Sequence, residues 1–199
     1  MKKIYLIGDS IREGYDQFVQ EELAGKALVY WSADNARYVW YTLRALWDWT
    51  QPAWDSMWTS CGFDPKEIDI VHWNNGLWDA LHMLGDETQT SYEEYRHGLE
   101  RIIRRLKVIF PNAQITFALS TSVIESRMSE IFYRRNAEIE QYNEIARQVM
   151  ARENIPIDDL YAVATQMSDD WHAADGTHYT KEGFQALGHA VAQFLESLL

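Results

Sequence analysis

The sequence predicts an α/β fold with a mostly parallel five-stranded sheet. Short apolar runs alternate along the chain with longer segments whose apolar residues recur at helical spacing, which is the pattern of repeated β-α units. The first run, Ile4 to Ile7, is apolar throughout, as expected for a strand that helices cover on both faces. With 199 residues, 47% hydrophobic and 24% charged, the chain has enough material for one globular domain spanning residues 1–199.

Five short segments are expected to form the strands of this sheet. They span residues 3–8, 27–31, 69–73, 114–119 and 155–158. Five longer segments with helical spacing are expected to form helices, and they span residues 11–23, 36–49, 91–110, 136–153 and 181–198. In the third helix, Ser91 and Glu94 have the spacing of a capping box, and Pro111 ends the helix. Two long loops remain, at residues 50–66 and 120–134, and loops of this length are often functional.

Composition excludes several classes of function. Acidic residues outnumber basic residues by 30 to 18, for a net charge of −12, so we expect neither nucleic acid nor an anionic membrane as partner. The single cysteine, Cys61, excludes an intrachain disulfide and a cysteine-rich zinc site. Because the sequence shows neither a signal peptide nor an apolar run of about 18 residues, we expect a cytoplasmic protein.

Polar residues are concentrated in three segments that should lie at the carboxyl edge of the sheet, where parallel α/β folds bind ligands. Ser10 follows the first strand, and a serine hydroxyl becomes a nucleophile when a base takes its proton. His178 follows Asp175 by three residues, so the carboxylate can orient one ring nitrogen while the other faces a substrate. Each segment also has a structural interpretation, with Ser10 as a helix N-cap and Asp175 as part of a turn.

The third segment contains Asn74 and Asn75 beside Gly76, after the third strand. Asparagines are poor strand formers, so their presence at the end of a strand needs a reason. An asparagine amide can donate to a developing oxyanion, and glycine lets the backbone approach a ligand closely. The alternative is that the two asparagines only end the strand through bonds between side chain and backbone.

Together, the three segments resemble those of the SGNH, or GDSL-type, hydrolases. Residues Gly8-Asp9-Ser10-Ile11 match that family's serine block, and Asp175-Gly176-Thr177-His178 match its Asp-x-x-His block. The resemblance covers essentially the whole chain and implies a three-layer α/β/α sandwich of the flavodoxin-like type. It also implies that Ser10 is the nucleophile, that His178 is the general base and then the acid, and that Asp175 orients His178.

The sequence departs from the family pattern at two oxyanion positions. In the family, three groups bind the oxyanion: the serine N–H, a glycine N–H after strand two, and the asparagine side chain of a Gly-x-Asn-Asp block. The serine N–H corresponds to that of Ser10 here. Residues 32–37 contain no glycine, so the N–H of Asn35 is the expected substitute, unless Asn35 only caps the next helix. Residues 76–79 have tryptophan in place of the asparagine. Period-two alternation then favours Asn74 as the amide donor, with Asn75 still open.

Aromatic residues near these segments are candidates for substrate contact. Among nine tryptophans, four fall in segments expected near the site, where they would stack on a sugar ring, hold an acyl chain or form apolar lids: Trp54, Trp58, Trp78 and Trp171. We expect Asp9, Trp78 and Trp171 to contact the substrate. Arg12 and His172 are expected at the surface, with contact to a substrate as the alternative, and His82 is expected to be exposed.

The expected activity is hydrolysis of a small acyl ester, an acetyl group on a carbohydrate, with no cofactor and no metal ion. Lipase, lysophospholipase and thioesterase activities are the alternatives that the resemblance implies. A metal-dependent hydrolase is an alternative of another class, because a cluster of imidazoles and carboxylates suits zinc or manganese: Asp169, Asp170, His172, Asp175 and His178. A further alternative is a non-catalytic protein that binds carbohydrates through its tryptophans.

Overall fold

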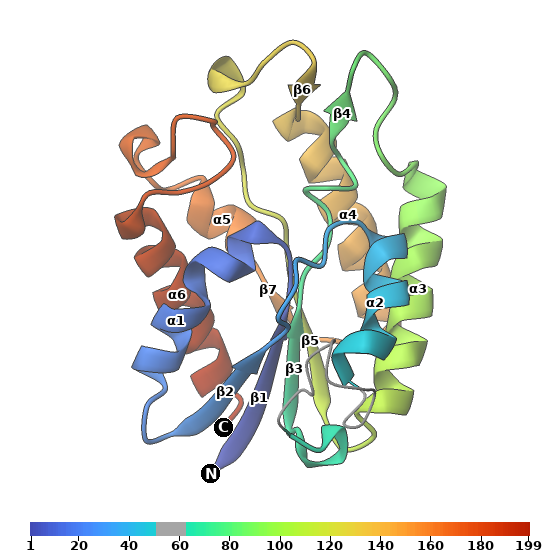
Figure 1. Cartoon of the computed structure of the whole chain (residues 1–199), viewed down its shortest axis with the longest axis vertical. Helices are drawn as coiled ribbons and strands as arrows, with labels where there is room; N and C mark the ends of the chain where they lie inside the picture. The colour runs from blue at the N-terminus through green and yellow to red at the C-terminus, as the bar shows by residue number, and fades with distance from the viewer. Residues whose placement is uncertain (51–62) are drawn as a thin grey trace.

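The computed structural model describes residues 1–50 and 63–199, and its centre is a five-stranded parallel sheet (Figure 1). The strand order is β2-β1-β3-β5-β7, and each neighbouring pair is parallel. These strands are β1 (Lys2–Ile7), β2 (Ala27–Trp31), β3 (Ile70–Trp73), β5 (Gln114–Ala118) and β7 (Ile157–Asp158). The predicted α/β fold with a five-stranded parallel sheet is therefore confirmed, with strand bounds within about two residues of the expected ones.

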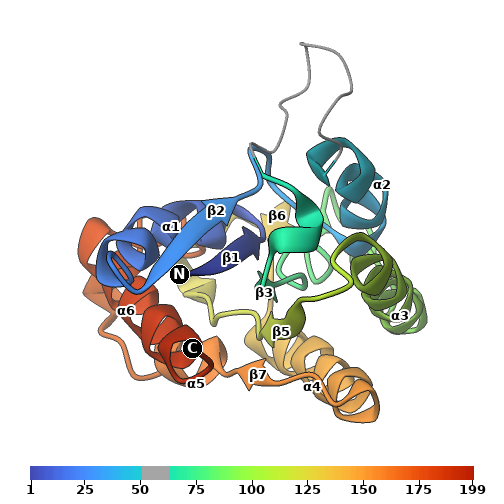
Figure 2. The same cartoon turned by 90° about the horizontal axis from the view of Figure 1, so that it is seen from below.

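Helices cover both faces of the sheet, which gives three layers (Figure 2). One face carries α1 (Ser10–Glu22), α5 (Leu160–Ala164) and α6 (Lys181–Glu196), and the other carries α2 (Val39–Thr50), α3 (Tyr92–Ile109) and α4 (Asn136–Glu153). The predicted capping box of Ser91 and Glu94 is present at the start of α3. Helix α5 was not predicted, because five residues are too few to show a helical period.

The apolar first strand lies inside the sheet, between β2 and β3. Residues Ile4 to Ile7 are at most 1% exposed, because helices pack on both of their faces. Each strand alternates its side chains between the two faces, so a strand buried on both must be apolar at consecutive positions. The end of β1, and Ser10 three residues after it, are therefore anchored to the packed core of the protein.

The carboxyl ends of the five strands share one edge, at the top in Figure 1, where additional short elements lie. Two strands that the sequence did not predict, β4 (His82–Met83) and β6 (Phe132–Tyr133), pair antiparallel there. The 3-10 turns η2 (Glu125–Arg127) and η3 (Asp169–Trp171) belong to neighbouring loops, whereas η1 (Pro65–Glu67) precedes β3. Two-residue strands carry no period in the sequence, so only their tertiary pairing reveals them.

Several polar side chains are more buried than expected. Arg12, expected at the surface, is 1% exposed and forms an ion pair with Asp16 at 2.9 Å between Nη1 and Oδ2. His82 and His172, also expected at the surface, are buried. These expectations were wrong because tertiary packing covers the three side chains: Ser32 reaches Arg12 from the next loop, Glu138 binds His82, and Tyr179 packs on the ring of His172.

Within the described ranges, no helix is long and apolar enough to cross a membrane. Three residues singled out in the sequence, Trp54, Trp58 and Cys61, lie outside the described residues, as does most of the predicted loop at 50–66.

Candidate active site

Ser10 is the first residue of α1, directly after the turn that leaves β1. The N-cap is Asp9, whose Oδ1 accepts a hydrogen bond from the N–H of Ile11 at 3.0 Å. The structural interpretation of Ser10 as N-cap is therefore wrong, and its hydroxyl is available for other bonds. The turn needs glycine at position 8, because a Cβ there would lie 2.0 Å from Oδ1 of Asn74.

His178 and Asp175 reach Ser10 from the loop before α6, at the other end of the chain. Nε2 of His178 lies 2.7 Å from Oγ of Ser10, and Nδ1 of His178 lies 2.6 Å from Oδ2 of Asp175. Oδ1 of Asp175 accepts the N–H groups of Thr177 and His178, each at 2.9 Å. Gly176, at a φ of 72°, makes the tight turn that lets the carboxylate of Asp175 accept both of these N–H groups. The three residues that the resemblance singled out are thus brought into one hydrogen-bonded chain.

The electrostatics of this chain favour a charged Asp175. Partial burial by itself raises the pKa of Asp175, but the hydrogen bonds from His178 and from two backbone N–H groups outweigh burial and hold the pKa below its usual value. An ionised carboxylate only accepts hydrogen bonds, so Nδ1 of His178 carries the proton. Nε2 of a neutral His178 then has its lone pair directed at the hydroxyl of Ser10.

A cavity of about 380 Å³ opens in front of Ser10 and His178. Its walls come mainly from the loop at residues 120–134, which the sequence marked as long enough for function, and from the segment after β3. Besides Ser10 and His178, the lining residues are Asp9, Leu77, Trp78, Arg127, Met128, Ser129, Phe132, Arg134, Asp175 and Thr177. We call this space the Ser10 cavity.

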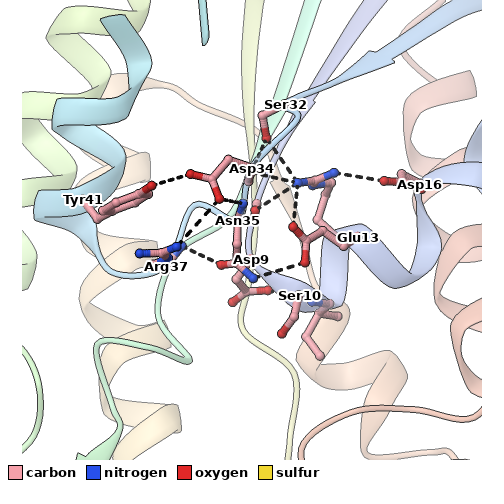
Figure 3. Close-up of polar contacts among 12 residues, drawn as sticks. Asp9, Ser10, Glu13, Asp16, Ser32, Asp34, Asn35, Arg37 and Tyr41 are labelled. Atoms are coloured by element: carbon pink, nitrogen blue, oxygen red, sulfur yellow. Dashed lines mark hydrogen bonds and ion pairs between the residues drawn. The ribbon is translucent and has the colours of Figure 1, made fainter. Parts of the chain in front are cut away.

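Asn35 does not offer the free N–H that the sequence predicted for an oxyanion. Its backbone N–H donates to Oδ1 of Asp34 at 2.8 Å, and its side-chain amide donates to Glu13 at 3.2 Å (Figure 3). Its side-chain oxygen accepts the N–H of Arg37 at 2.9 Å. The prediction of Asn35 as an oxyanion donor is therefore wrong, and the side chain instead holds the turn between β2 and α2.

Asn75 is likewise fully occupied. Its Nδ2 donates to the carbonyl of Arg37 at 2.7 Å and to Oγ1 of Thr42 at 2.9 Å, and its Oδ1 accepts Nε1 of Trp73 at 2.7 Å. The amide has no further donor for a substrate, so the open alternative of Asn75 as oxyanion donor is wrong. Its role is to join β3 to α2.

Asn74 points to the other side of the chain, toward Gly8 and Asp9. Burial raises the pKa of Asp9, and hydrogen bonds from the Ile11 N–H and the Asn74 side chain oppose that rise. Asp9 is fully buried and caps α1, yet it lines the Ser10 cavity, so its contact with a substrate stays a prediction. Asn74 is 6% exposed and is not among the residues that line the Ser10 cavity, so its role as amide donor stays a prediction.

The two tryptophans predicted to bind substrate lie in different places. Trp78 is half-buried and lines the Ser10 cavity. Trp171 is 40% exposed on η3 and is not part of the cavity wall, so the structure does not bring it to the site.

Two arginines in the cavity wall were missed by sequence reasoning. Arg134 is 4% exposed, and its Nε and Nη1 donate to the carbonyl of Leu77 and to Oγ1 of Thr177. Burial lowers its pKa to about 10, while the charges of Asp9 and Asp175 act to raise it, so the guanidinium stays protonated at neutral pH. Arg127 donates from Nη1 to the carbonyls of His172 and Ala173. Their only signal in the sequence was their position in the long loop.

The alternative metal site is not assembled. Among the described side chains, no three His, Cys, Asp or Glu residues are grouped in a way that would hold a metal ion. The ring of His172 packs on Tyr179 at 4.4 Å between centroids, and His178 and Asp175 bind each other.

Solved structures with this fold include several ester hydrolases. The lipase/acylhydrolase from Enterococcus faecalis is 22% identical over 100% of this chain and 97% of its own, with a TM-score of 0.74. The acetyl xylan esterase AlAXEase is 17% identical over 97% of this chain and 99% of its own, with a TM-score of 0.72. A GDSL-like lipase from Bacteroides thetaiotaomicron is 13% identical over 100% and 89%, with a TM-score of 0.68.

Sequence comparison gives the family directly. No curated protein matches the sequence significantly. The sequence model of the GDSL-like lipase/acylhydrolase family, however, matches residues 6–186, which include Ser10, Asp175 and His178. The chain therefore belongs to the GDSL-like lipase/acylhydrolase family of ester hydrolases.

Proposed function

We propose that the chain is a serine esterase that removes a small acyl group, an acetyl group, from a carbohydrate through an acyl-enzyme on Ser10. The observation that carries the proposal is the hydrogen-bonded chain from Ser10 through His178 to Asp175, with 2.7 Å between Oγ and Nε2. Family membership supports the reaction class, and the Ser10 cavity supplies room for a substrate.

In the first half of the reaction, Oγ of Ser10 attacks the carbonyl carbon of the ester while Nε2 of His178 accepts the hydroxyl proton. The tetrahedral intermediate collapses when the bond to the alcohol breaks, and His178 gives the proton to the departing oxygen. In the second half, His178 takes a proton from water, which attacks the acyl-enzyme. The acid leaves, and the proton returns to Ser10. Asp175 holds the ring and stabilises its charged form.

The negative oxygen of the intermediate needs hydrogen-bond donors, and the chain offers two candidates. The N–H of Ser10 belongs to the first turn of α1, where no helical carbonyl is available to accept it and the helix dipole favours an anion. The side-chain amide of Asn74 is the second candidate, placed by the carboxylate of Asp9. Removing one such donor typically lowers kcat by roughly 10²–10³.

The proposed substrate follows from the cavity. A space of about 380 Å³ suits a short acyl chain with one ring of the alcohol, and Trp78 offers an aromatic face for a sugar. The acetyl xylan esterase among the structural neighbours is compatible with this assignment.

The test is hydrolysis of p-nitrophenyl acetate, butyrate and octanoate, together with acetate release from acetylated xylan. We expect the wild type to turn over the acetate fastest, and Ser10→Ala to lose roughly 10⁴-fold or more of kcat. Ser126→Ala is the matched control, because Ser126 is an exposed serine of the same edge that does not line the cavity. Retained activity in Ser10→Ala contradicts the proposal, and preference for octanoate supports the lipase alternative instead.

A further inference from the structure

The wall of the Ser10 cavity contains two arginines, bound to the loop that carries Asp175 and His178, which ester hydrolysis itself does not require. We propose that Arg134 and Arg127 form an anion subsite, so that the natural ester carries a carboxylate or phosphate group near the bond that is cleaved. This inference rests on the proposed function and names its substrate class more closely.

The first argument is the burial of Arg134 without a counter-ion. In the part of the chain that the structure describes, Arg12 and Arg134 are the two buried arginines. Arg12 has its charge neutralised by Asp16 at 2.9 Å. Arg134 forms no ion pair with a described carboxylate: the charges of Asp9 and Asp175 act on it only from beyond ion-pair distance, and its direct contacts are the neutral oxygens of Leu77 and Thr177 and the ring of Phe132. A buried cation without a partner is costly, so a guanidinium kept in this place points to a ligand that supplies the charge.

The second argument is where the unused donors lie. Nε and Nη1 of Arg134 donate to Leu77 and Thr177, which belong to the cavity wall, and these two hydrogen bonds fix the plane of the guanidinium. Its Nη2 has no described partner, and Arg134 lines the Ser10 cavity. Arg127, half-buried, is anchored in the same way through Nη1 and lines the same cavity. Two fixed guanidinium groups with free N–H groups match the oxygens of a carboxylate or phosphate.

The third argument is that the carboxylates of the cavity do not compete for these donors. Asp175 is bound to His178 and to two backbone N–H groups, and Asp9 is fully buried against Ile11 and Asn74. Both carboxylates line the cavity, but neither forms an ion pair with Arg127 or Arg134, so the remaining N–H groups of the two arginines are open to an anionic substrate.

The experiment compares three aryl acetates that share the scissile bond and differ at the para position: methyl 4-acetoxybenzoate, 4-acetoxybenzoate and 4-acetoxyphenyl phosphate. The quantity measured is the ratio of kcat/KM for each anionic ester to that for the neutral ester. We expect this ratio to fall about tenfold or more in Arg134→Met for at least one anion, because a charge-assisted hydrogen bond is lost. Arg134→Lys should keep part of the preference. The carboxylate and phosphate arms show which anion fits.

Arg135→Met is the matched control, because Arg135 is the exposed neighbour that pairs with Glu138 and does not line the Ser10 cavity. Its ratio should equal that of the wild type. Arg127→Met keeps the proposal testable if Arg134→Met does not fold, and it should lower the ratio about threefold or more. An unchanged ratio in the arginine variants, or an equal loss for neutral and anionic esters, overturns the subsite. Failure of the wild type to hydrolyse even the neutral ester would instead overturn the proposed function.

Discussion

Replacing Asp79 by asparagine should change how stability depends on pH. Asp79 is fully buried after β3, where its Oδ1 accepts the N–H of Val39 at 3.1 Å and its Oδ2 has no described partner. Burial raises the pKa of Asp79 from 3.8 to about 7, although the Val39 N–H and the Thr90 side chain lower it. Because the folded state holds this proton more tightly, the stability that the protonated side chain contributes is complete below pH 4 and is lost as the pH rises through 7.

The size of the effect follows from the shift. One pKa unit corresponds to about 1.4 kcal/mol, so a rise from 3.8 to about 7 costs up to about 4 kcal/mol of stability once the pH exceeds 7. The amide in Asp79→Asn is neutral at every pH, keeps an oxygen for Val39 and adds a donor next to the hydroxyl of Thr90. We therefore expect the variant to gain on the wild type by a few kcal/mol between pH 5 and pH 8.

The assay is urea unfolding of the wild type and the variant at pH 5, 6, 7 and 8. Asp170→Asn is the control, since it makes the same substitution at an exposed aspartate on η3. Asp16, whose pKa burial also raises, is present in every protein compared and cancels in the difference. The charge of Asp9 itself raises the pKa of Asp79, so the difference includes this coupling. A difference in unfolding free energy that stays constant from pH 5 to pH 8 refutes the reasoning.

Three further predictions concern the site and its support. Asn74→Ala should lower kcat by roughly 10²-fold in steady-state assays, and Asn75→Ala should cost about 2 kcal/mol in urea unfolding, because the side chains of Trp73 and Thr42 and the carbonyl of Arg37 lose their bonds. Asn143→Ala should cost about 2 kcal/mol in the same unfolding assay, since Asn143 binds both the N–H and the carbonyl of Ser120 at 2.9 Å. The kcat/KM for p-nitrophenyl acetate should fall as the pH is lowered, because only neutral His178 accepts the serine proton, and a flat profile counts against His178 as the base.

Much of the fold could be predicted because its signals are local. An apolar run such as Ile4 to Ile7 shows a strand buried on both faces, and the capping box of Ser91 shows where α3 begins. The pair β4 and β6 could not be predicted, since two short segments some 50 residues apart meet only in the folded chain. The burial of Arg12 has the same cause, because Ser32 and Asp34 reach its guanidinium from the next loop.

In the candidate site, too, the residues with local signals could be predicted, and the contacts that form only in the folded chain could not. Ser10, Asp175 and His178 lie in segments whose residue types and spacing carry information, and the structure brings them together. The asparagines show the limit of such reasoning, since two identical neighbouring side chains contact different elements: Asn74 lies against Asp9, and Asn75 binds Trp73 and Thr42. Period-two alternation separated them, but no pattern showed that the backbone N–H of Asn35 donates to Asp34 and its side-chain amide to Glu13 of α1.

The central claim is that the hydroxyl of Ser10 is activated by His178. Labelling with a fluorophosphonate, followed by mass spectrometry of the digested protein, tests it most directly, because the probe reacts with an activated serine and marks its position. We expect one phosphonyl group on the peptide that contains Ser10, none in Ser10→Ala, and much slower labelling in His178→Ala. A wild type that takes no label and hydrolyses no ester, or one labelled at another residue, contradicts the claim.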